Sequence, residues 1–359
     1  MPNNQPSYKI QAASKLLELS PQQVRRLTDE SGIEIETINS GSAKVRTYKP
    51  ENLFDLAAFK RVKSKVKFNR KLGVIYTPKG GVGKTTIASN MGIIFALLGL
   101  RTLLVDIDFQ SNLTLALGYD SDLDETDAHE RGLPLSEIVQ DSFGDLVRSD
   151  RGLTLKDVIK MPYGPNGPHL IPSDVNLNEF DSWLMVKRLS GKTQPIAEWI
   201  MQMLASETPG NSLAEYDIIL FDSSPNKSLI TEGVLLAADY VIAPVSLDNF
   251  ARKGLSYLSD VLHQLRTDYG RNPELILQPN FYNQRLFRTG KQVDLLARDY
   301  QANLMEETIR ASEDFPRALS DANQNIPIVF SKPTAPPVED LFSVAHSLLK
   351  RMGVVQGDA

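Results

Sequence analysis

The chain has 359 residues, of which 42% are apolar, and a formal net charge of −5, a length at which about two domains are expected. It contains no cysteine, which excludes disulfide frameworks and thiolate metal sites. Residues 1–7 lack the features of a secretory signal and no apolar run approaches the roughly 20 residues of a membrane span, so we expect a soluble, cytoplasmic protein that does not use a membrane.

The amino-terminal part of the chain is basic. Residues 1–71 contain 14 Lys and Arg against 7 Asp and Glu, which leaves a net charge of −12 for the remainder. A localised excess of positive charge is typical of segments that bind nucleic acids. This part of the chain is therefore a candidate for DNA binding.

Two short helices are predicted at the start of the basic part. Residues 12–17 have the apolar spacing of the first. For the second, Ser20 is a predicted N-cap, Pro21 takes the first helical position and Gln23 completes a capping box. Gly32 suits the end of that helix. The order predicts a helix-turn-helix.

A hairpin and a further helix are expected next. Residues 34–47 alternate around a polar turn, and the segment from Tyr48 to Leu53 begins a helix. The whole order resembles the winged helix of MerR-type regulators. That resemblance implies DNA contacts through four basic residues: Arg25, Arg26, Lys44 and Arg46. The alternative is a three-helix cap that binds protein and carries ordinary surface arginines.

The basic run from Lys60 to Lys67 marks the expected domain boundary. We predict a winged helix-turn-helix domain with a basic linker over residues 1–68, and a second domain over residues 69–359. The run itself suits a solvated helix end as well as it suits an arm that contacts phosphate.

Residues 73–86 carry the most specific motif, an apolar strand followed by a glycine loop that ends in Gly-Lys-Thr. Backbone N–H groups of such a loop, with the start of the next helix, surround a phosphate. Lys84 can reach the β and γ phosphates, and Thr85 offers a hydroxyl to Mg²⁺. The sequence therefore predicts a site for a nucleoside triphosphate. The ATP-binding residues are expected to be Lys79, Gly80, Gly81, Val82, Gly83, Lys84, Thr85 and Thr86.

The loop departs from the common P-loop pattern, because Pro78 stands where a glycine is usual and Lys79 precedes the glycines. In this it resembles the deviant P-loop of the ParA/MinD family of dimerising ATPases. The resemblance implies that Lys79 reaches the nucleotide of the partner subunit in a homodimer.

Two further predicted strands end in acids. Residues 101–106 lead into Asp106 and Asp108, and residues 216–221 lead into Asp222. Asp222 has the position of a Walker-B carboxylate, which would hold Mg²⁺ through water. By resemblance, Asp108 orients the attacking water and Asp106 helps to organise the Mg²⁺ shell. The metal set is thus Thr85, Asp106 and Asp222, and the catalytic set is Lys79, Lys84 and Asp108. Either Asp106 or Asp108 could instead be only a polar strand end.

The rest of the chain continues the same alternation. Residues 120–130 form an acidic insertion, expected as a solvated loop, and residues 338–352 suit a closing helix. Segments around Arg285 and Arg310 resemble ParA segments whose arginines contact DNA without sequence preference; ordinary surface charge is the alternative.

We therefore expect an α/β fold: a mostly parallel, doubly wound P-loop NTPase sheet flanked by helices, preceded by a small winged helix-turn-helix domain. The ParA resemblance implies a Mg²⁺-dependent ATPase for plasmid or chromosome partition, slow and stimulated by a ParB-like partner. It also implies ATP-dependent dimerisation, non-specific DNA binding at the nucleoid and repression of its own operon through the amino-terminal domain. A MinD-like or other cargo-positioning ATPase, and an ATP-responsive transcription regulator, are the alternatives.

Overall fold

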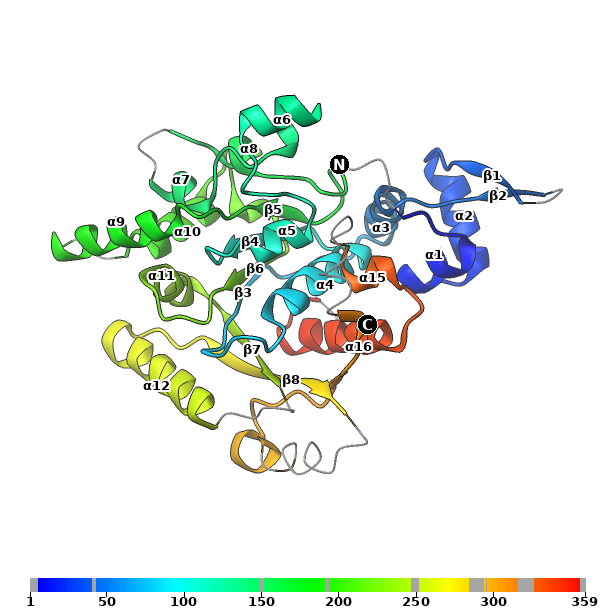
Figure 1. The fold of residues 1–359 in the computed structure, drawn as a ribbon. Coiled ribbons are helices and arrows are strands. Elements are labelled where there is room, and N and C mark those ends of the chain that lie inside the picture. The colour runs from blue at the N-terminus through cyan, green and yellow to red at the C-terminus, as the bar shows by residue number, and fades with distance from the viewer. Residues whose placement is uncertain are drawn as a thin grey trace.

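The computed structural model describes residues 6–40, 43–148, 152–191, 194–246, 252–283, 294, 296–315 and 326–355. At its centre lies a seven-stranded sheet in the order β5-β4-β6-β3-β7-β8-β9 (Figure 1). Each neighbouring pair of these strands is parallel, which confirms the predicted parallel sheet. The strands are β3 (Lys71–Ile75), β4 (Thr102–Ile107), β5 (His169–Ile171), β6 (Ile218–Ser223), β7 (Tyr240–Ser246), β8 (Glu274–Tyr282) and β9 (Ile309–Arg310).

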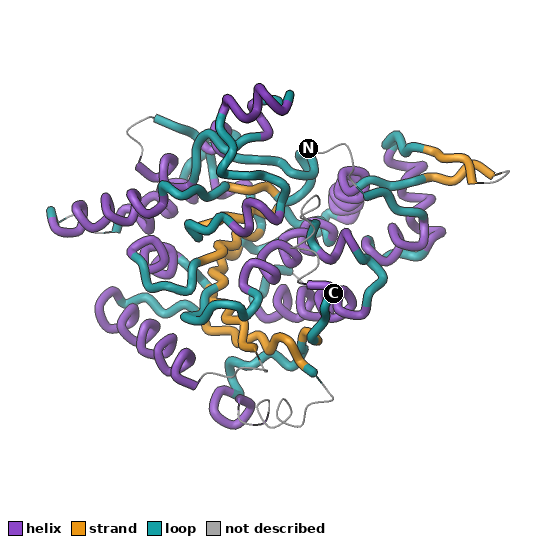
Figure 2. The backbone as a smooth tube through the Cα atoms, in the orientation of Figure 1, coloured by secondary structure: helices purple, strands orange, loops and turns teal. Residues whose placement is uncertain are grey.

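Helices cover both faces of the sheet, so the strands form a middle layer (Figure 2). Side chains alternate along each strand, and the apolar ones therefore divide between two cores. In β3, Val74 belongs to one core and Ile75 to the other. The core of Ile75 is completed by α4 (Lys84–Leu97), α15 (Ile328–Ser331) and α16 (Pro336–Arg351). The core of Val74 is completed by α7 (Phe143–Arg148), α9 (Leu177–Leu189), α10 (Pro195–Ala205), α11 (Leu229–Ala237) and α12 (Arg252–Tyr269).

The amino-terminal segment contains the expected helices and hairpin. Its elements are α1 (Ile10–Leu16), α2 (Pro21–Ser31), β1 (Thr37–Ser40), β2 (Ala43–Arg46) and α3 (Pro50–Ser64). The capping box of α2 forms as predicted, with Ser20 accepting from the Gln23 N–H and the Gln23 side chain accepting from the Ser20 N–H. Gly32 ends α2 with a φ of 69°, a conformation that glycine adopts without steric cost. β1 and β2 pair antiparallel.

An aromatic cluster joins this segment to the face of the sheet that carries α4, α15 and α16. The Phe330 ring contacts Tyr8, Phe54 and Tyr163, with ring centres 5.1–6.1 Å apart. The Tyr8 hydroxyl also donates to the Phe330 carbonyl at 2.7 Å. Apolar residues of α1, α2 and α3 thus belong to the same continuous core as α4 and α16.

Short helices fill the connections. They are α5 (Asn112–Ala116), α6 (Glu125–Arg131), α8 (Leu155–Val158), and the 3₁₀ turns η1 (Leu135–Glu137) and η2 (Leu213–Glu215). The acidic insertion, expected as a loop, contains α6, because Asp124 and Asp127 form a capping box and Gly132 ends the helix. Among the described residues, no helix has the length and apolar character needed to cross a membrane.

Candidate functional site: the loop between β3 and α4

The glycine loop lies at the carboxyl end of β3, the edge at which parallel sheets bind ligands. Gly81 and Gly83 have φ values of 70° and 87°, in the left-handed region that favours glycine. Gly83 is the N-cap residue of α4, and α4 begins at Lys84 as predicted. Successive N–H groups in such a turn, ahead of a helix N-terminus, form an anion-binding concavity.

Lys84 lies within this concavity and is 8% exposed. Its Nζ donates to the Lys79 carbonyl at 3.1 Å, so the side chain folds back over the loop. Burial lowers the pKa of Lys84, and attraction to Asp222 and Asp108 opposes that shift. An anion bound by the loop would supply the negative charge that this buried ammonium group otherwise draws from the carboxylates.

Asp106 and Asp222 lie side by side, because β4 and β6 are neighbours and these two residues are in register. The Asp222 Oδ2 accepts from the Thr85 hydroxyl at 2.7 Å, which places the P-loop threonine and the Walker-B acid together. The other oxygen, Oδ1, is buried with no hydrogen-bond partner among the described residues. Burial, and then repulsion from Asp106, raises the pKa of Asp222.

An unpaired, buried carboxylate oxygen is costly unless a cation or a donor meets it. The Thr85 hydroxyl beside Asp222 forms the oxygen-rich surroundings that Mg²⁺ prefers. The residues present therefore fit a magnesium ion. Among the described residues, no group of three His, Cys, Asp or Glu side chains is arranged as a metal site, here or elsewhere, so the fit rests on Asp222 together with the Thr85 hydroxyl.

The Asp106 carboxylate is occupied by protein donors. Its Oδ1 accepts from the Asp108 N–H at 3.1 Å, and its Oδ2 accepts from the N–H and the hydroxyl of Thr114 at 2.9 and 2.8 Å. Burial raises the pKa of Asp106 to about 7, against the effect of these bonds. Asp106 thus holds the segment that carries Asp108, which favours an indirect contribution to a metal shell.

Asp108 is 7% exposed. Burial raises its pKa, while the Gln110 N–H, which donates to its Oδ1 at 3.1 Å, and the nearby Lys84 lower it. The Ser173 hydroxyl donates to its carbonyl at 2.6 Å and fixes the backbone from the loop after β5. The structure therefore brings Lys84, Asp108 and Asp222 within electrostatic reach of one another.

Three contributors were missed by sequence reasoning. Thr114 and Ser173 hold Asp106 and Asp108, and Asn280 donates to the Val82 carbonyl within the glycine loop at 2.7 Å. Polar side chains at the end of an apolar strand, such as Gln278 and Asn280 in β8, are the signal that could have indicated the last of these.

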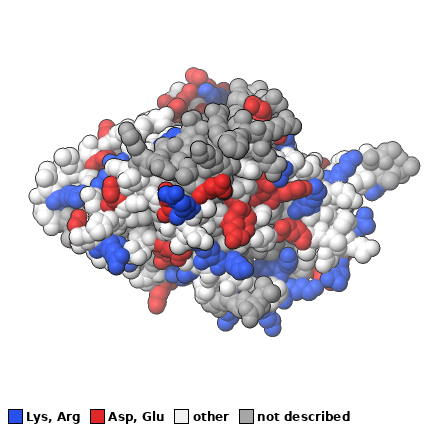
Figure 3. Space-filling view, turned by 90° about the horizontal axis from the view of Figure 1, so that it is seen from below, with Lys and Arg blue, Asp and Glu red and all other residues white. Residues whose placement is uncertain are grey.

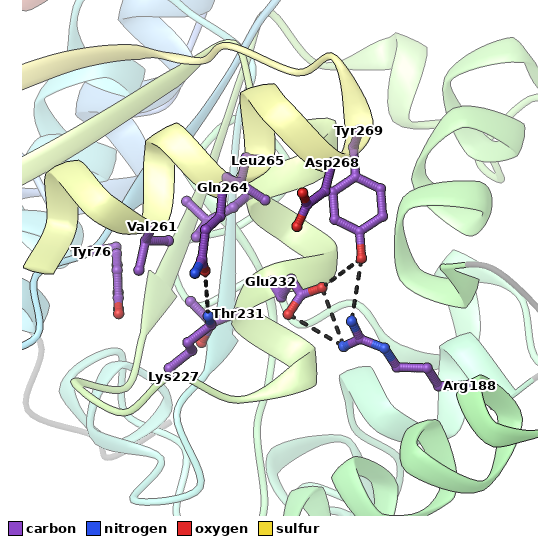
Figure 4. A pocket seen from close by; sticks show the side chains of 11 residues that line it. Tyr76, Arg188, Lys227, Thr231, Glu232, Val261, Gln264, Leu265, Asp268 and Tyr269 are labelled. Atoms are coloured by element: carbon purple, nitrogen blue, oxygen red, sulfur yellow. Dashed lines mark hydrogen bonds and ion pairs between the residues drawn. The ribbon is translucent and has the colours of Figure 1, made fainter.

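A small cavity of about 20 Å³ touches the loop at Lys79 and Val82, and two larger ones lie away from it. A cavity of about 90 Å³ between α11 and α12 is lined by apolar and polar side chains, several of which bond to one another (Figure 4). In it, Tyr269 donates to Glu232 at 3.1 Å and Arg188 pairs with Glu232 at 3.3 Å. A larger cavity of about 520 Å³ lies at the opposite edge of the sheet, between α3 and the starts of β4 and β5. The three acids and Lys84 do not line either cavity, so cavity size does not identify the candidate site.

Some of the candidate DNA-binding residues form ion pairs within the protein, and others are exposed. Arg25, Arg26 and Lys44 are exposed, and Arg26 lies 3.8 Å from Glu30. Arg46 pairs with Asp29 at 2.8 Å and so joins the hairpin to α2. Seen from below, basic side chains are frequent near the hairpin and acidic ones near the middle of the molecule (Figure 3). Arg25 and Arg26 thus lie on the exposed side of the middle of α2, whereas Asp29 and Glu30 near its end pair with basic side chains.

The other two candidates lie in the carboxyl-terminal half. Arg310 forms a bidentate pair with Asp340, with Nε and Nη2 each 2.6 Å from a carboxylate oxygen. Arg285 lies outside the described residues.

Known proteins resemble this chain over most of its length. A family model described as an AAA domain matches residues 70–276. The cell division protein PomZ of Myxococcus xanthus is 23% identical over 352 residues, which are 97% of this chain and 94% of that protein. The chromosome partitioning protein ParA of the same organism is 30% identical over 207 residues, 57% of this chain and 61% of that protein.

A solved structure shares the fold. Cobyrinic acid a,c-diamide synthase from Mycobacterium smegmatis, with bound ADP and magnesium, matches with a TM-score of 0.60 at 18% identity. The match covers 79% of this chain and 96% of that one. At this identity the likeness concerns the fold alone, since one fold can carry different activities.

Proposed function

Because this chain belongs to the AAA domain family and is a ParA-type P-loop ATPase, we propose that it moves DNA, as an ATP-dependent homodimer that binds DNA non-specifically. The observation that carries the proposal is the meeting of Lys84, Thr85 and Asp222 at the ends of neighbouring strands. The likeness to a chromosome partitioning protein supports DNA as the cargo.

The proposed reaction is hydrolysis of ATP to ADP and phosphate. Such a transfer depends on positioning and on neutralising charge, and needs no covalent intermediate. In the proposal Lys84 binds the β and γ phosphates, the loop N–H groups surround them, and Asp108 orients the attacking water. Magnesium, when bound, would supply positive charge to the phosphates, and Thr85 and Asp222 are the residues that would hold it.

Lys79 connects hydrolysis to dimerisation in this proposal. Its carbonyl is bonded to Lys84, and by family resemblance its side chain reaches the nucleotide of the partner subunit. ATP would then favour the dimer, and hydrolysis, stimulated by a ParB-like protein, would release it from DNA.

We assign DNA binding to two places. Residues 1–68 form the proposed winged helix-turn-helix domain, in which Arg25 and Arg26 approach the major groove while Lys44 and Arg46 hold phosphates. Residues 69–359 form the proposed ATPase domain, where Arg285 and Arg310 contact phosphates without reading sequence. The first site would bind the operator of the protein's own operon, and the second would place the protein on the nucleoid.

The deciding experiment measures binding to a non-specific duplex without nucleotide, with ADP, with ATP, and with ATP for the Lys84→Ala variant. We expect binding that requires ATP and is lost in the variant. Equal binding in every state would assign DNA affinity to the amino-terminal segment alone and favour an ATP-responsive regulator. Footprinting at the protein's own promoter tests autorepression, and an unprotected promoter would contradict it.

A role in positioning another cargo is the second candidate, since the likeness to PomZ, a cell division protein, extends over 97% of this chain. In that case ATP-dependent DNA binding would persist, but no ParB-like protein would stimulate hydrolysis. Pelleting with anionic vesicles separates a MinD-like mode, in which the ATP-bound protein would sediment with lipid.

A further inference from the structure

The buried side-chain amide of Asn280 contacts the glycine loop. Asn280 lies in β8, is 2% exposed, and donates from Nδ2 to the Val82 carbonyl at 2.7 Å. Its Oδ1 accepts from the Phe281 N–H at 3.0 Å, so both ends of the amide are engaged. The bond between Asn280 and Val82 links residues that are 198 positions apart in the chain.

The direction of the Val82 carbonyl fixes the direction of a donor in the loop. In a planar trans peptide the carbonyl of Val82 and the N–H of Gly83 point to opposite sides. Since Asn280 holds the carbonyl toward β8, the Gly83 N–H faces away from β8. Gly81 and Gly83 both adopt positive φ, and glycine could accept the reversed peptide at little steric cost.

The end of β8 also packs directly against the loop. A Cβ atom on Gly83 would lie 2.6 Å from Asn280 Nδ2 and 3.1 Å from the Phe281 ring. Phe281 has a φ of 59°, which is uncommon for a residue other than glycine, and its N–H is held by Asn280. Such a backbone persists where its surroundings over-determine it.

We propose that Asn280 is a positioning residue for the nucleotide: it holds the Val82–Gly83 peptide in the one orientation that presents its N–H to phosphate. The inference rests on the nucleotide site proposed above. Asn280 bonds to the loop backbone and not to the side chains that would contact the γ phosphate or the attacking water. It therefore acts on the binding of ATP and ADP alike and leaves the hydrolytic step unchanged.

The chain offers a matched control. Gln278 lies two residues earlier in β8, is fully buried, and donates from Nε2 to the carbonyls of Pro279 and Glu307. Gln278→Met and Asn280→Ala each remove a buried amide from the same strand, but only the second removes a bond to the loop. A difference in nucleotide affinity between the two variants therefore reports the bond to Val82.

The test is titration of the purified full-length protein with ADP and Mg²⁺ by calorimetry, with steady-state ATP hydrolysis alongside. A buried carbonyl left without its donor predicts that Asn280→Ala raises the Kd for ADP about tenfold. The KM for ATP should rise by a similar factor while kcat stays within about twofold, the pattern of lost uniform binding. Gln278→Met should bind ADP with the wild-type Kd.

Asn280→Asp serves if the alanine variant does not fold, because it keeps the shape and places an acceptor where the donor was. A wild-type Kd in either Asn280 variant would overturn the proposal, as would equal weakening in Gln278→Met. A wild-type protein that binds neither ADP nor ATP would instead refute the nucleotide site itself.

Discussion

The ion pair between Arg310 and Asp340 predicts that neutralising Asp340 strengthens DNA binding. Asp340 is the fifth residue of α16, and its carboxylate accepts from the N–H, Nε and Nη2 of Arg310 at 3.0, 2.6 and 2.6 Å. A DNA phosphate that pairs with Nε and Nη2 of Arg310 must replace this carboxylate. Asp340→Asn removes the competing charge and frees the arginine.

The size of the effect follows from exposure. The Arg310 side chain is 48% exposed and that of Asp340 is 14% exposed. Exposed ion pairs contribute about 0.2–1 kcal/mol, and the bidentate geometry places this pair near the upper end. About 1 kcal/mol corresponds to about a fivefold lower Kd for DNA, and the gain should shrink as salt is added.

Glu339→Gln is the control. It removes the same charge one residue earlier, from a pair with Lys15 at 3.4 Å in which both side chains are at least half exposed. The assay is fluorescence anisotropy of a labelled non-specific duplex with ATP and Mg²⁺ over a range of salt. We expect Asp340→Asn to lower the Kd for DNA more than Glu339→Gln does. When Arg310→Ala is added to both variants, this difference in Kd should disappear. Equal gains in the two variants, or weaker binding by Asp340→Asn, would refute Arg310 as a phosphate contact that Asp340 restrains.

Three more predictions concern catalysis, the ion pair that joins α3 to the residue before β6, and the dependence of stability on pH. Asp108→Asn should slow ATP turnover about a hundredfold while Kd for ADP is retained, measured by phosphate release and calorimetry; equal loss of both would contradict a role confined to hydrolysis. Arg61→Ala leaves the Asp217 carboxylate, which is 6% exposed, with Arg101 as its remaining cationic partner. The free energy of unfolding, measured in urea, should therefore fall by about 3 kcal/mol, and an unchanged urea midpoint would be inconsistent with a buried pair. The Glu18 carboxylate lies 2.6 Å from His346 and raises the pKa of that histidine. The pair therefore stabilises the folded protein below the pKa of the unfolded histidine, and this stabilisation is lost as pH rises through the folded pKa. The Tm of wild type should fall more than that of Glu18→Gln between pH 6 and 8.

Features fixed by neighbours in sequence were predictable. The capping box of Ser20 and Gln23, the left-handed Gly32 and the start of α4 at Lys84 each depend on fewer than five consecutive residues. Asp222 was recognisable because a run of apolar residues ends in it. Local rules sufficed because these residues satisfy the backbone groups of their own segment.

Features that depend on the order of the strands or on how helices pack were not predictable from the sequence. The register that sets Asp106 beside Asp222 requires β4 and β6 to be neighbours, although the two acids are 116 positions apart in sequence. The pairing of Arg310 with Asp340 requires β9 to lie beside the amino-terminal half of α16. The aromatic cluster at Phe330 similarly depends on how the amino-terminal segment packs on α15. Sequence patterns identify such residues as candidates, and the tertiary fold decides their partners.

The glycines that let the loop wrap a phosphate also leave it free to adopt other conformations, so its shape must be held from outside. Two buried asparagines from different elements hold the loop and the helix that follows it. Asn280 holds the Val82 carbonyl from β8. Asn90 donates to the Thr86 carbonyl at 2.7 Å and accepts from the Val329 N–H at 3.1 Å, which ties the first turn of α4 to α15. Because α15 also carries Phe330, the support for the candidate nucleotide site and the anchor of the amino-terminal segment are the same short helix.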